Sequence, residues 1–233
     1  TLRGRVEHAA GAKVVSADLV VEPDPNGGFA LSVPLTEGEN AITVELRMPD
    51  GKDVARRTLT MIRDTTPPVV ALDAVPAVTC EDRVVFRGRV QEPGCVVTVA
   101  GQPVALDDKG LFEVSVSVEL GERRVELVAR DALGNRTRAT RTIERLPLVE
   151  VSAARLSGER ALLNFMKALN GPHWIRFQPG RYIACIAMSG GHVYEGRGAN
   201  PTDTVLEAET GDTLRIFSKS LLLKNLTLRC TSN

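Results

Sequence analysis

The sequence is poor in aromatic residues, in cysteine and in net charge, and the last two shortages each exclude a class of protein. Aromatic residues make up 4% of the 233 residues, and 29 basic residues balance 29 acidic ones. A neutral chain has no net field to attract nucleic acid or an anionic membrane. Its apolar runs are also too short to span a bilayer. We therefore expect no nucleic-acid partner and no insertion into a membrane.

Cysteine is too scarce to build the fold. Four residues are fewer than a disulfide scaffold of this length needs, and their spacing matches no metal-ligand motif (Cys80, Cys95, Cys185 and Cys230). Export from the cell would allow a bridge between Cys80 and Cys95. Cys185 and Cys230 are expected to be buried as small apolar side chains.

Motifs for catalysis and cofactor binding are missing as well. The chain has no Gly-x-Ser-x-Gly elbow and no glycine-rich phosphate loop, and its three histidines fall in separate segments (His8, His173 and His192). We expect no catalytic residue, no cofactor and no bound metal. Four carboxylates near one set of predicted corners would suit calcium, but exposed carboxylates on strand edges are the commoner explanation (Asp203, Glu207, Glu209 and Asp212).

What the sequence does contain is a long internal repeat. Val85-Phe-Arg-Gly-Arg-Val90 echoes Thr1-Leu-Arg-Gly-Arg-Val6, and Gly110-Leu-Phe112 echoes Gly27-Gly-Phe29. The matching glycines, at 4 and 88, lie 84 positions apart, and the matching phenylalanines, at 29 and 112, lie 83 apart. A unit of that length is a domain rather than one turn of a solenoid. We therefore predict domains at residues 1–66 and 67–147, followed by different material at 148–233.

Both repeats show the two-residue period of strands with one apolar face. Alternation runs through residues 29–35 and 42–46 of the first repeat and 112–118 of the second, with turn residues between the runs. Asp64-Thr-Thr-Pro-Pro68 is a short, stiff linker. The second repeat then opens with Val69-Val-Ala-Leu72, an extra strand without a counterpart in the first. We expect the first domain to lack its opening strand, and the chain to be a piece of a longer polypeptide.

Four motifs of the second repeat resemble a known family. Gly88-Arg-Val-x-x-Pro-Gly94, Thr98-Val-x-Gly-Gln-Pro-Val104, Asp108-x-Gly-x-Phe112 and Asp131-x-x-Gly-Asn135 are similar to bacterial immunoglobulin-like domains found in arrays on exported proteins. The linker is similar to those that join such domains, and the resemblance covers residues 1–146. It implies β-sandwiches of about seven short strands that act as spacers or binding modules. It carries no shared catalytic residue.

The segment after residue 147 begins with a helix signal. Ser157 is placed as an N-cap with Glu159 in the first turn, and Gly171-Pro172 supplies the stop. Apolar residues between them recur at helical spacing (Leu162, Phe165, Met166 and Leu169). This predicts one amphipathic helix whose apolar stripe covers a core. From Trp174 onwards, apolar-rich strands alternate with tight corners, which predicts coils of a parallel β-helix with the helix as its cap.

This segment resembles a second family. Trp174-Ile-x-Phe-x-Pro-Gly-x-Tyr182, Val193-Tyr-Glu-Gly-x-Gly198, Pro201-Thr-x-Thr-Val-Leu206 and Leu223-Lys-Asn-Leu-Thr-Leu228 are similar to the start of a pectin-lyase-like right-handed β-helix, over residues 158–233. That class contains polysaccharide lyases, glycoside hydrolases and non-catalytic adhesins, and its active sites lie on later coils. The resemblance therefore implies a β-helix and assigns no catalytic residue to this chain.

Five residues of the segment are candidates for binding a ligand. Arg176, Arg181 and Arg197 would suit acidic sugars through paired hydrogen bonds, and Trp174 and Tyr182 would suit stacking on a sugar ring. Plainer explanations are edge charges that discourage aggregation and a tryptophan packed at the start of a domain. Asn225-Leu-Thr227 fits the N-glycosylation pattern, but Asn225 is also placed to be a ladder residue at a corner.

Together these observations predict an all-β chain of two immunoglobulin-like sandwiches and a helix-capped partial right-handed parallel β-helix. The predicted function is non-catalytic: a structural or adhesive segment of a secreted or cell-surface bacterial protein, with the sandwiches as spacers that present the β-helix. The alternatives are the N-terminal scaffold of a polysaccharide-degrading lyase or glycoside hydrolase, and a carbohydrate-binding module. The expected partner is a polysaccharide or another cell-surface protein.

Overall fold

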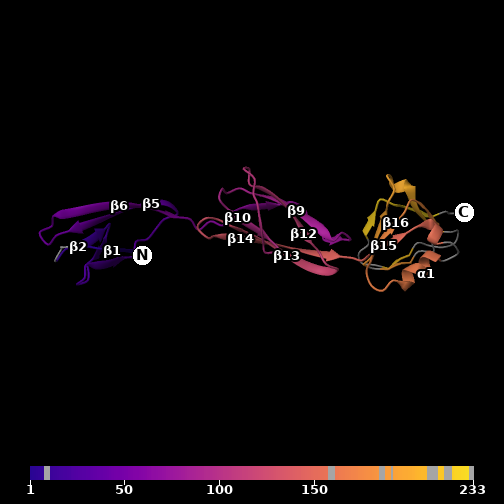
Figure 1. Ribbon diagram of the computed structural model, residues 1–233, viewed down its shortest axis with the longest axis horizontal. Helices are drawn as coiled ribbons and strands as arrows, with labels where there is room; N and C mark the ends of the chain where they lie inside the picture. The colour runs from indigo at the N-terminus through magenta and orange to yellow at the C-terminus, as the bar shows by residue number, and fades with distance from the viewer. Residues whose placement is uncertain are drawn as a thin grey trace. The chain divides into compact units, whose positions relative to one another are not determined.

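The computed structural model describes residues 1–7, 11–156, 161–183, 187–189, 191–208, 215–217 and 222–230 (Figure 1). Strands dominate it, so the chain is all-β as predicted. It divides into two units, one of Thr1–Pro68 with Arg130–Arg136 and the other of Val69–Ala129 with Thr137–Asn233. Several residues with an expected role lie outside the described residues (His8, Ser157, Glu159, Cys185, Glu209 and Asp212).

The first repeat forms two sheets. β1 (Leu2–Arg5) pairs antiparallel with β4 (Gly28–Leu31). The other sheet has the order β3-β2-β5-β6 and is antiparallel throughout, with β2 (Lys13–Ser16), β3 (Leu19–Val21), β5 (Gly38–Arg47) and β6 (Asp53–Arg63). The strand predicted over residues 29–35 ends at Leu31 and is therefore shorter than expected. Pro34, which has no N–H for a ladder, lies beyond its end.

The second repeat also forms two sheets, and it has more strands. One sheet has the order β12-β9-β7, with β7 (Val70–Leu72), β9 (Arg83–Val90) and β12 (Leu111–Ser117) antiparallel. The other has the order β11-β10-β13-β14-β8, with β8 (Val78–Thr79), β10 (Val96–Val99), β11 (Gln102–Val104), β13 (Gly121–Arg130) and β14 (Arg136–Arg145). Every second side chain of β9 is buried, as its alternation predicts. Phe86, Leu127 and Ile143 are fully enclosed in the core of this repeat.

The two repeats have the same strand register, and one turn in each has the same hydrogen bonds. Gly4 lies opposite Phe29, and Gly88 lies opposite Phe112. A Cβ on either glycine would come within 2.5 and 2.7 Å of the facing phenylalanine ring, which explains why glycine occupies both positions. In the turn before each phenylalanine, one aspartate carboxylate accepts two backbone N–H groups at 2.7–2.9 Å (Asp24 in the first repeat and Asp107 in the second). The internal repeat of the sequence is thus also a repeat of the structure.

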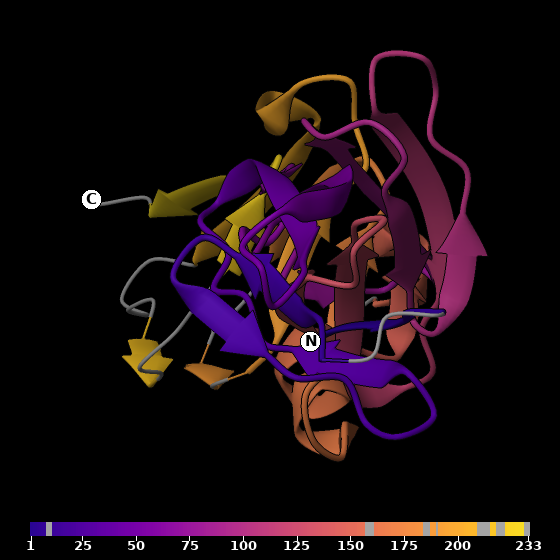
Figure 2. The ribbon, with the colours of Figure 1, turned by 90° about the vertical axis from the view of Figure 1, so that its left-hand side faces the viewer.

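The C-terminal strands form three parallel sheets, drawn in orange and yellow (Figure 2). The first sheet contains β15 (Leu148–Val151), β16 (Trp174–Phe177), β19 (Val193–Gly196) and β22 (Leu222–Lys224). The second contains β17 (Gly180–Ile183), β20 (Thr204–Ala208) and β23 (Thr227–Cys230), and the third β18 (Ala187–Ser189) and β21 (Arg215–Phe217). Each sheet takes its strands in chain order, so successive circuits of the chain add their strands to the same sheets.

The helix α1 (Ala161–Ala168) packs its apolar stripe into the interior of these sheets. Leu162 and Met166 are buried in one cluster with Ile175, Phe177 and Tyr182. Two short 3-10 helices, Ala153–Arg155 and Pro201–Asp203, lie between strands. In the described part of the chain, no helix has the length and apolar character that a bilayer crossing requires.

Asn225 marks a corner inside a run that the sequence shows as one strand. Its φ of 47° breaks residues 222–230 into β22 and β23. The Asn225 side-chain Nδ2 donates to the carbonyl oxygens of Gly196 at 3.1 Å and of Gly198 at 2.7 Å. The carboxamide therefore ties its own corner to the corner one circuit earlier, and both of its N–H groups are used.

Candidate functional site

A row of alternating charges crosses the first parallel sheet. The register places Glu150, Arg176, Glu195 and Lys224 in a line, one on each of β15, β16, β19 and β22. Arg176 Nε lies 2.7 Å from Glu195 Oε2, and Arg176 Nη1 lies 4.0 Å from Glu150 Oε1. We call these four residues the charged ladder. Opposite charges on directly adjacent strands stabilise the pairing of those strands.

Trp174 completes the ladder from the neighbouring position on the same face of β16. Its indole N–H donates to Glu195 Oε2 at 2.8 Å, and Lys224 Nζ lies 4.3 Å from the centre of its ring. An ammonium group over an indole face is attracted by the ring quadrupole. The Trp174 side chain is buried. Its indole N–H is bonded to Glu195 and one ring face contacts Lys224.

The same face packs against the end of the second repeat. Trp174 and Val193 form an apolar cluster with Cys80 and Leu146. Arg176 Nη2 lies 3.3 Å from Cys80 Sγ and 3.5 Å from Glu81 Oε1, both of which follow β8. Arg176 therefore contacts carboxylates of the parallel sheet and of the sandwich at once. We call this contact the junction.

Burial and charge oppose each other at the junction. Burial raises the pKa of Glu195, but hydrogen bonds from Arg176 and Trp174 outweigh it, so the pKa of that carboxyl lies below its ordinary value. Burial likewise lowers the pKa of Arg176, and the bond to Glu195 more than restores it. Burial raises the pKa of the Cys80 thiol, although the Arg176 guanidinium acts in the opposite direction. Glu195 and Arg176 are therefore charged near neutral pH, and Cys80 is a thiol.

Tyr182 and Arg181, on β17, lie apart from the charged ladder. The Tyr182 hydroxyl donates toward the carbonyl oxygens of Gln178 at 2.8 Å and Val151 at 3.1 Å, inside the core. Burial raises the pKa of Tyr182. Arg181 projects outward and forms an ion pair with Glu207, whose own side chain is buried. Tyr182 thus packs, while the Arg181 guanidinium stays accessible beside its carboxylate.

Arg197 lies at the edge of the charged ladder. Its Nη1 lies 3.4 Å from Glu150 Oε1, so it joins the end of the charged ladder, and its side chain is 56% exposed. Of the five, Trp174 and Arg176 are brought together, Arg197 lies near them through Glu150, and Arg181 and Tyr182 lie on another sheet. Binding of a ligand by any of them stays a prediction.

The carboxylates considered for calcium have other partners where they are described. Asp203 Oδ2 accepts the backbone N–H of Asn200 at 2.9 Å and closes the turn before β20. Glu207 pairs with Arg181. Both contacts are structural, and neither residue presents an open group of oxygens to a cation.

A turn in the first unit holds the buried carboxylate of Asp131. Asp131 belongs to the motif Asp131-x-x-Gly-Asn135, but the motif did not predict its burial. Asp131 Oδ1 accepts the backbone N–H groups of Leu133, Gly134 and Asn135 at 2.6–2.9 Å. Burial raises the pKa of Asp131, and these bonds together with the Asn135 side chain lower it below its ordinary value. Asn135 Nδ2 also donates to the Asp64 carbonyl at 3.0 Å.

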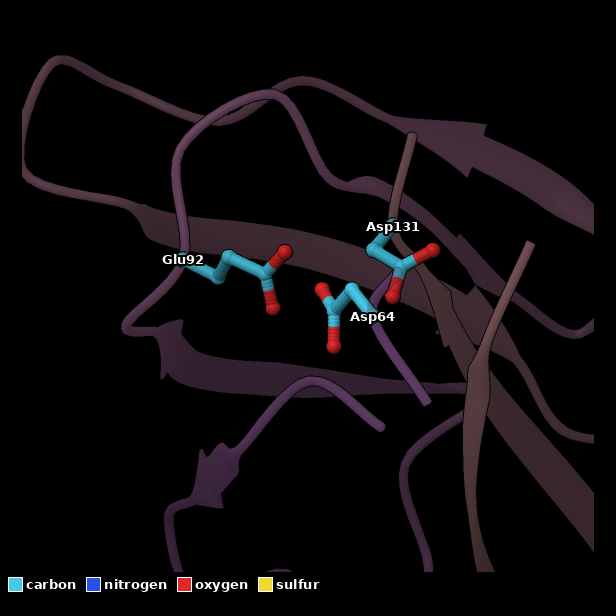
Figure 3. A group of neighbouring side chains, drawn as sticks. All are labelled: Asp64, Glu92 and Asp131. Atoms are coloured by element: carbon cyan, nitrogen blue, oxygen red, sulfur yellow. The ribbon is translucent and has the colours of Figure 1, made fainter. Parts of the chain in front are cut away.

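Asp64 brings a second carboxylate close to this turn. Carboxylate oxygens of Asp64 and Asp131 lie within 4.8 Å of each other, and Figure 3 shows both side chains. Glu92, also labelled there, belongs to the other unit. Because the Asp131 oxygens already accept several N–H groups, we assign no ion to the pair.

The described histidines serve packing. His192 is buried, its Nδ1 accepts the backbone N–H of His173 at 3.1 Å, and its ring lies edge-on to Tyr194. Burial, followed by the nearby His173, lowers the pKa of His192. A neutral imidazole with a bonded Nδ1 is held in a single tautomer as part of the core.

Export from the cell would allow a bridge between Cys80 and Cys95, and the structure shows both of these residues as free thiols. Cys80 belongs to the junction cluster, whereas Cys95 belongs to the core of the second repeat. Two thiols in separate clusters are held there by packing.

Comparison with known proteins gives only distant likenesses. No family model and no curated protein matches the sequence. Among solved structures, the fibronectin(III)-like modules of Clostridium thermocellum CbhA are 14% identical over 64% of this chain and 80% of that chain, with a TM-score of 0.38. A 1.5-MDa bacterial ice-binding adhesin is 14% identical over 63% of this chain and 60% of that chain, with a TM-score of 0.30.

A third solved structure, the Family 28 exopolygalacturonase of Yersinia enterocolitica, is 10% identical over 62% of this chain and 41% of that chain, with a TM-score of 0.26. All three TM-scores lie below 0.5. The function must therefore be argued from the residues of this chain.

Proposed function

We propose that this chain is a non-catalytic structural segment of a secreted or cell-surface bacterial protein. In it, two immunoglobulin-like sandwiches act as spacers, and the second holds the first coils of a right-handed parallel β-helix in a fixed orientation. The observation that carries the proposal is the junction, where Arg176 joins the first parallel sheet to the end of the second repeat through Cys80 and Glu81.

The strand pairing supports both fold classes. The second repeat has two sheets of short strands that enclose one apolar core, which is the architecture of a β-sandwich. In the C-terminal segment the chain passes from sheet to sheet and returns to each one strand further along, always in parallel. Stacked circuits of this kind, tied corner to corner by Asn225, support a β-helix.

The junction has the composition of a fixed joint. Two domains of one chain move relative to each other by default unless the contact between them is apolar and well packed. Here Trp174, Val193 and Leu146 form a buried cluster, and the Arg176 side chain is only 14% exposed. A charge buried to that extent destabilises the protein unless its partners are in place, so it favours one arrangement over all others.

The paired state of the polar groups supports a non-catalytic role. In the described part of the junction, Glu195 accepts from Arg176 and Trp174, and the Cys80 thiol contacts Glu81. A general base or nucleophile needs a side chain that faces substrate. These side chains face one another. The accessible arginines, Arg181 and Arg197, remain the candidates for contact with a polysaccharide or another surface protein.

One experiment tests the fixed joint. Backbone 15N relaxation should give one rotational correlation time for the amides of β9–β14 and of β15–β23. In Arg176→Ala, the two sets should separate. Arg138→Ala is the matched control, because Arg138 forms an exposed ion pair with Glu126 in the second repeat alone. Two correlation times in the parent protein would show that the joint is mobile and would overturn the spacer proposal.

A second experiment addresses catalysis. The chain is incubated with a panel of acidic and neutral polysaccharides, and new reducing ends and unsaturated products are measured. We expect no depolymerisation. Turnover by the folded chain that is absent from a denatured sample would contradict the non-catalytic role. It would favour the polysaccharide-degrading alternative.

A further inference from the structure

The chain enters and leaves the second repeat at opposite ends. Its closing segment, Val69–Thr79, follows the linker and pairs antiparallel with β9 as β7, so that Val70 lies opposite Val90. The segment then pairs parallel with β14 as β8, where Thr79 lies beside Arg145. Because β9 runs back from the end of β8 to the start of β7, the start of β7 and the end of β14 are at opposite ends of the repeat. A pull on the flanking parts of the chain therefore acts along these strands.

The ladder of β7 with β9 receives such a pull first. At one end of it, Gln91 donates its backbone N–H to the Val69 carbonyl at 3.3 Å. At the other end, Asp73 donates to the Arg87 carbonyl at 2.9 Å. Bonds between antiparallel strands lie across the strand direction. A pull along β7 therefore strains all of them together, in shear, rather than opening them one after another.

The ladder of β8 with β14 is loaded in the same way. Glu144 donates its backbone N–H to the Ala77 carbonyl at 2.8 Å, and Leu146 donates to the Thr79 carbonyl at 2.9 Å. The two strands run in one direction, and the pull acts on the start of β8 and on the end of β14. They would have to slide past each other, which strains both bonds at once.

Side chains fasten the closing segment at the point where the chain leaves the repeat. Arg145 Nε donates to the Cys80 carbonyl at 3.4 Å, and Arg145 Nη1 donates to the Val118 carbonyl at 3.1 Å. Arg176 Nη2 lies 3.3 Å from Cys80 Sγ across the junction. Thr79 and Cys80 are only 6% and 7% exposed. Water therefore has little access to this end of the segment.

We propose that the second repeat bears mechanical tension along the chain, and that the closing segment, held by Arg145, is the clamp that resists it. The segment must be torn from β9 or from β14 before the repeat extends. The proposal deepens the spacer function and rests on it for the source of the pull, because a spacer transmits any force on the part that it presents. A mobile junction would overturn the fixed joint and leave the clamp intact, since the clamp lies within residues 69–146. The two proposals therefore fail on different results.

Single-molecule force spectroscopy on the whole chain tests the clamp with two pairs of attachment points at one loading rate. Handles at Val69 and Leu148, both exposed, pull the ladders in shear. Handles at Asp82 and Leu148 pull from the same end of β8 and β14 and open that ladder one bond at a time. The rupture force should be about twofold higher for the first pair, because two bonds of the β8–β14 ladder share the load. The length released should match the residues between the handles.

Two arginines of β14 provide a matched pair of variants. Arg145→Ala removes bonds to two backbone carbonyls outside its own strand, whereas Arg141→Ala removes only a bond to the carbonyl of the preceding residue. With handles at Val69 and Leu148, the rupture force should fall in Arg145→Ala and stay unchanged in Arg141→Ala. Forced unfolding follows the unfolding barrier, so urea midpoints are measured alongside to separate this effect from equilibrium stability.

Three results would each overturn the proposal. The first is a rupture force for the pair Val69 and Leu148 that is equal to or lower than the force for Asp82 and Leu148. The second is an unchanged force in Arg145→Ala, and the third is an equal fall in Arg141→Ala. The comparison of attachment points keeps both arginines, so it decides the question even if Arg145→Ala does not fold.

Discussion

Replacing Arg176 by alanine should destabilise the C-terminal segment far more than the loss of an exposed ion pair would. The change leaves the Glu195 carboxylate without its closest cation and removes the contacts to Cys80 and Glu81. Removal of one member of a fully buried pair costs about 3–5 kcal/mol. The side chains of Arg176 and Glu195 are 14% and 24% exposed, so solvent screens part of that effect. We expect a loss of about 2–3 kcal/mol.

The assay is unfolding in urea followed by tryptophan fluorescence. Trp174 is the single tryptophan of the chain and lies at the junction, so its emission reports this region. With an m-value of about 2 kcal/mol per molar urea, the midpoint should fall by about 1 M or more. Arg87→Ala is the control, because Arg87 binds Glu113 with similar geometry at 2.8 and 3.1 Å on an exposed surface. Equal midpoints for Arg176→Ala and Arg87→Ala would refute the argument.

The pH dependence of the same variants gives an independent check. The pKa of Glu195 is lowered in the folded protein, so its contribution to stability is fully present above the ordinary pKa of 4.5 and is lost as the pH falls through the lower folded value. The difference in midpoint between the parent protein and Arg176→Ala should therefore be constant from pH 7 to about pH 5 and should shrink below about pH 4.5. A difference that grows on acidification would contradict the charged state assigned to Glu195.

Three further predictions concern other parts of the chain. Asn225→Ala should lower the free energy of unfolding by about 3 kcal/mol, because it loses two hydrogen bonds and puts alanine in a left-handed backbone conformation. Asn225→Gly should lose only the bonds, so urea unfolding should show it about 1–2 kcal/mol more stable than the alanine variant. Thiol labelling of Cys80 should be faster in Arg176→Ala than in the parent protein while labelling of Cys95 stays unchanged, as read by peptide mass spectrometry; equal rates for both would argue against local opening of the junction. Asp131→Asn should lower the calorimetric midpoint at pH 7 and converge with the parent protein below the ordinary aspartate pKa of about 3.9, because the folded pKa of Asp131 is depressed; a constant difference down to pH 2 would contradict this.

The strands of the second repeat were predictable because their signal is local. Alternation in β9 and β12 buries every second residue against a single core, and glycines at the turns fix the ends. The extra strand at Val69–Leu72 was also visible, since it is apolar and follows two prolines. What the sequence did not show is that this segment continues across to the second sheet as β8. That depends on a pairing with β14, which lies far along the chain.

The charged ladder could not be predicted for the same reason. Glu150, Arg176, Glu195 and Lys224 fall into line only through the register of four parallel strands. From the sequence, Arg176 and Trp174 were ligand candidates because of their residue types. Their partners Glu195 and Glu81 carried no signal that distinguished them from other surface carboxylates. Asn225 is an intermediate case, since its corner was suggested by the motif but its two carbonyl partners were not.

The segment between the linker and β9 is part of the second repeat by its strand pairing. This closing segment, Val69–Thr79, pairs with β9 as β7 and with β14 as β8. Deletion of residues 69–79 from the chain should leave β9 without β7 and β14 without β8. Val90 and Ile143, now 2% and 0% exposed, should then become as accessible as Val6 and Leu59 are in the first repeat. Hydrogen exchange would show faster exchange at β9 and β14 in that variant. Unchanged protection would mean that the sheets of the second repeat do not depend on the closing segment.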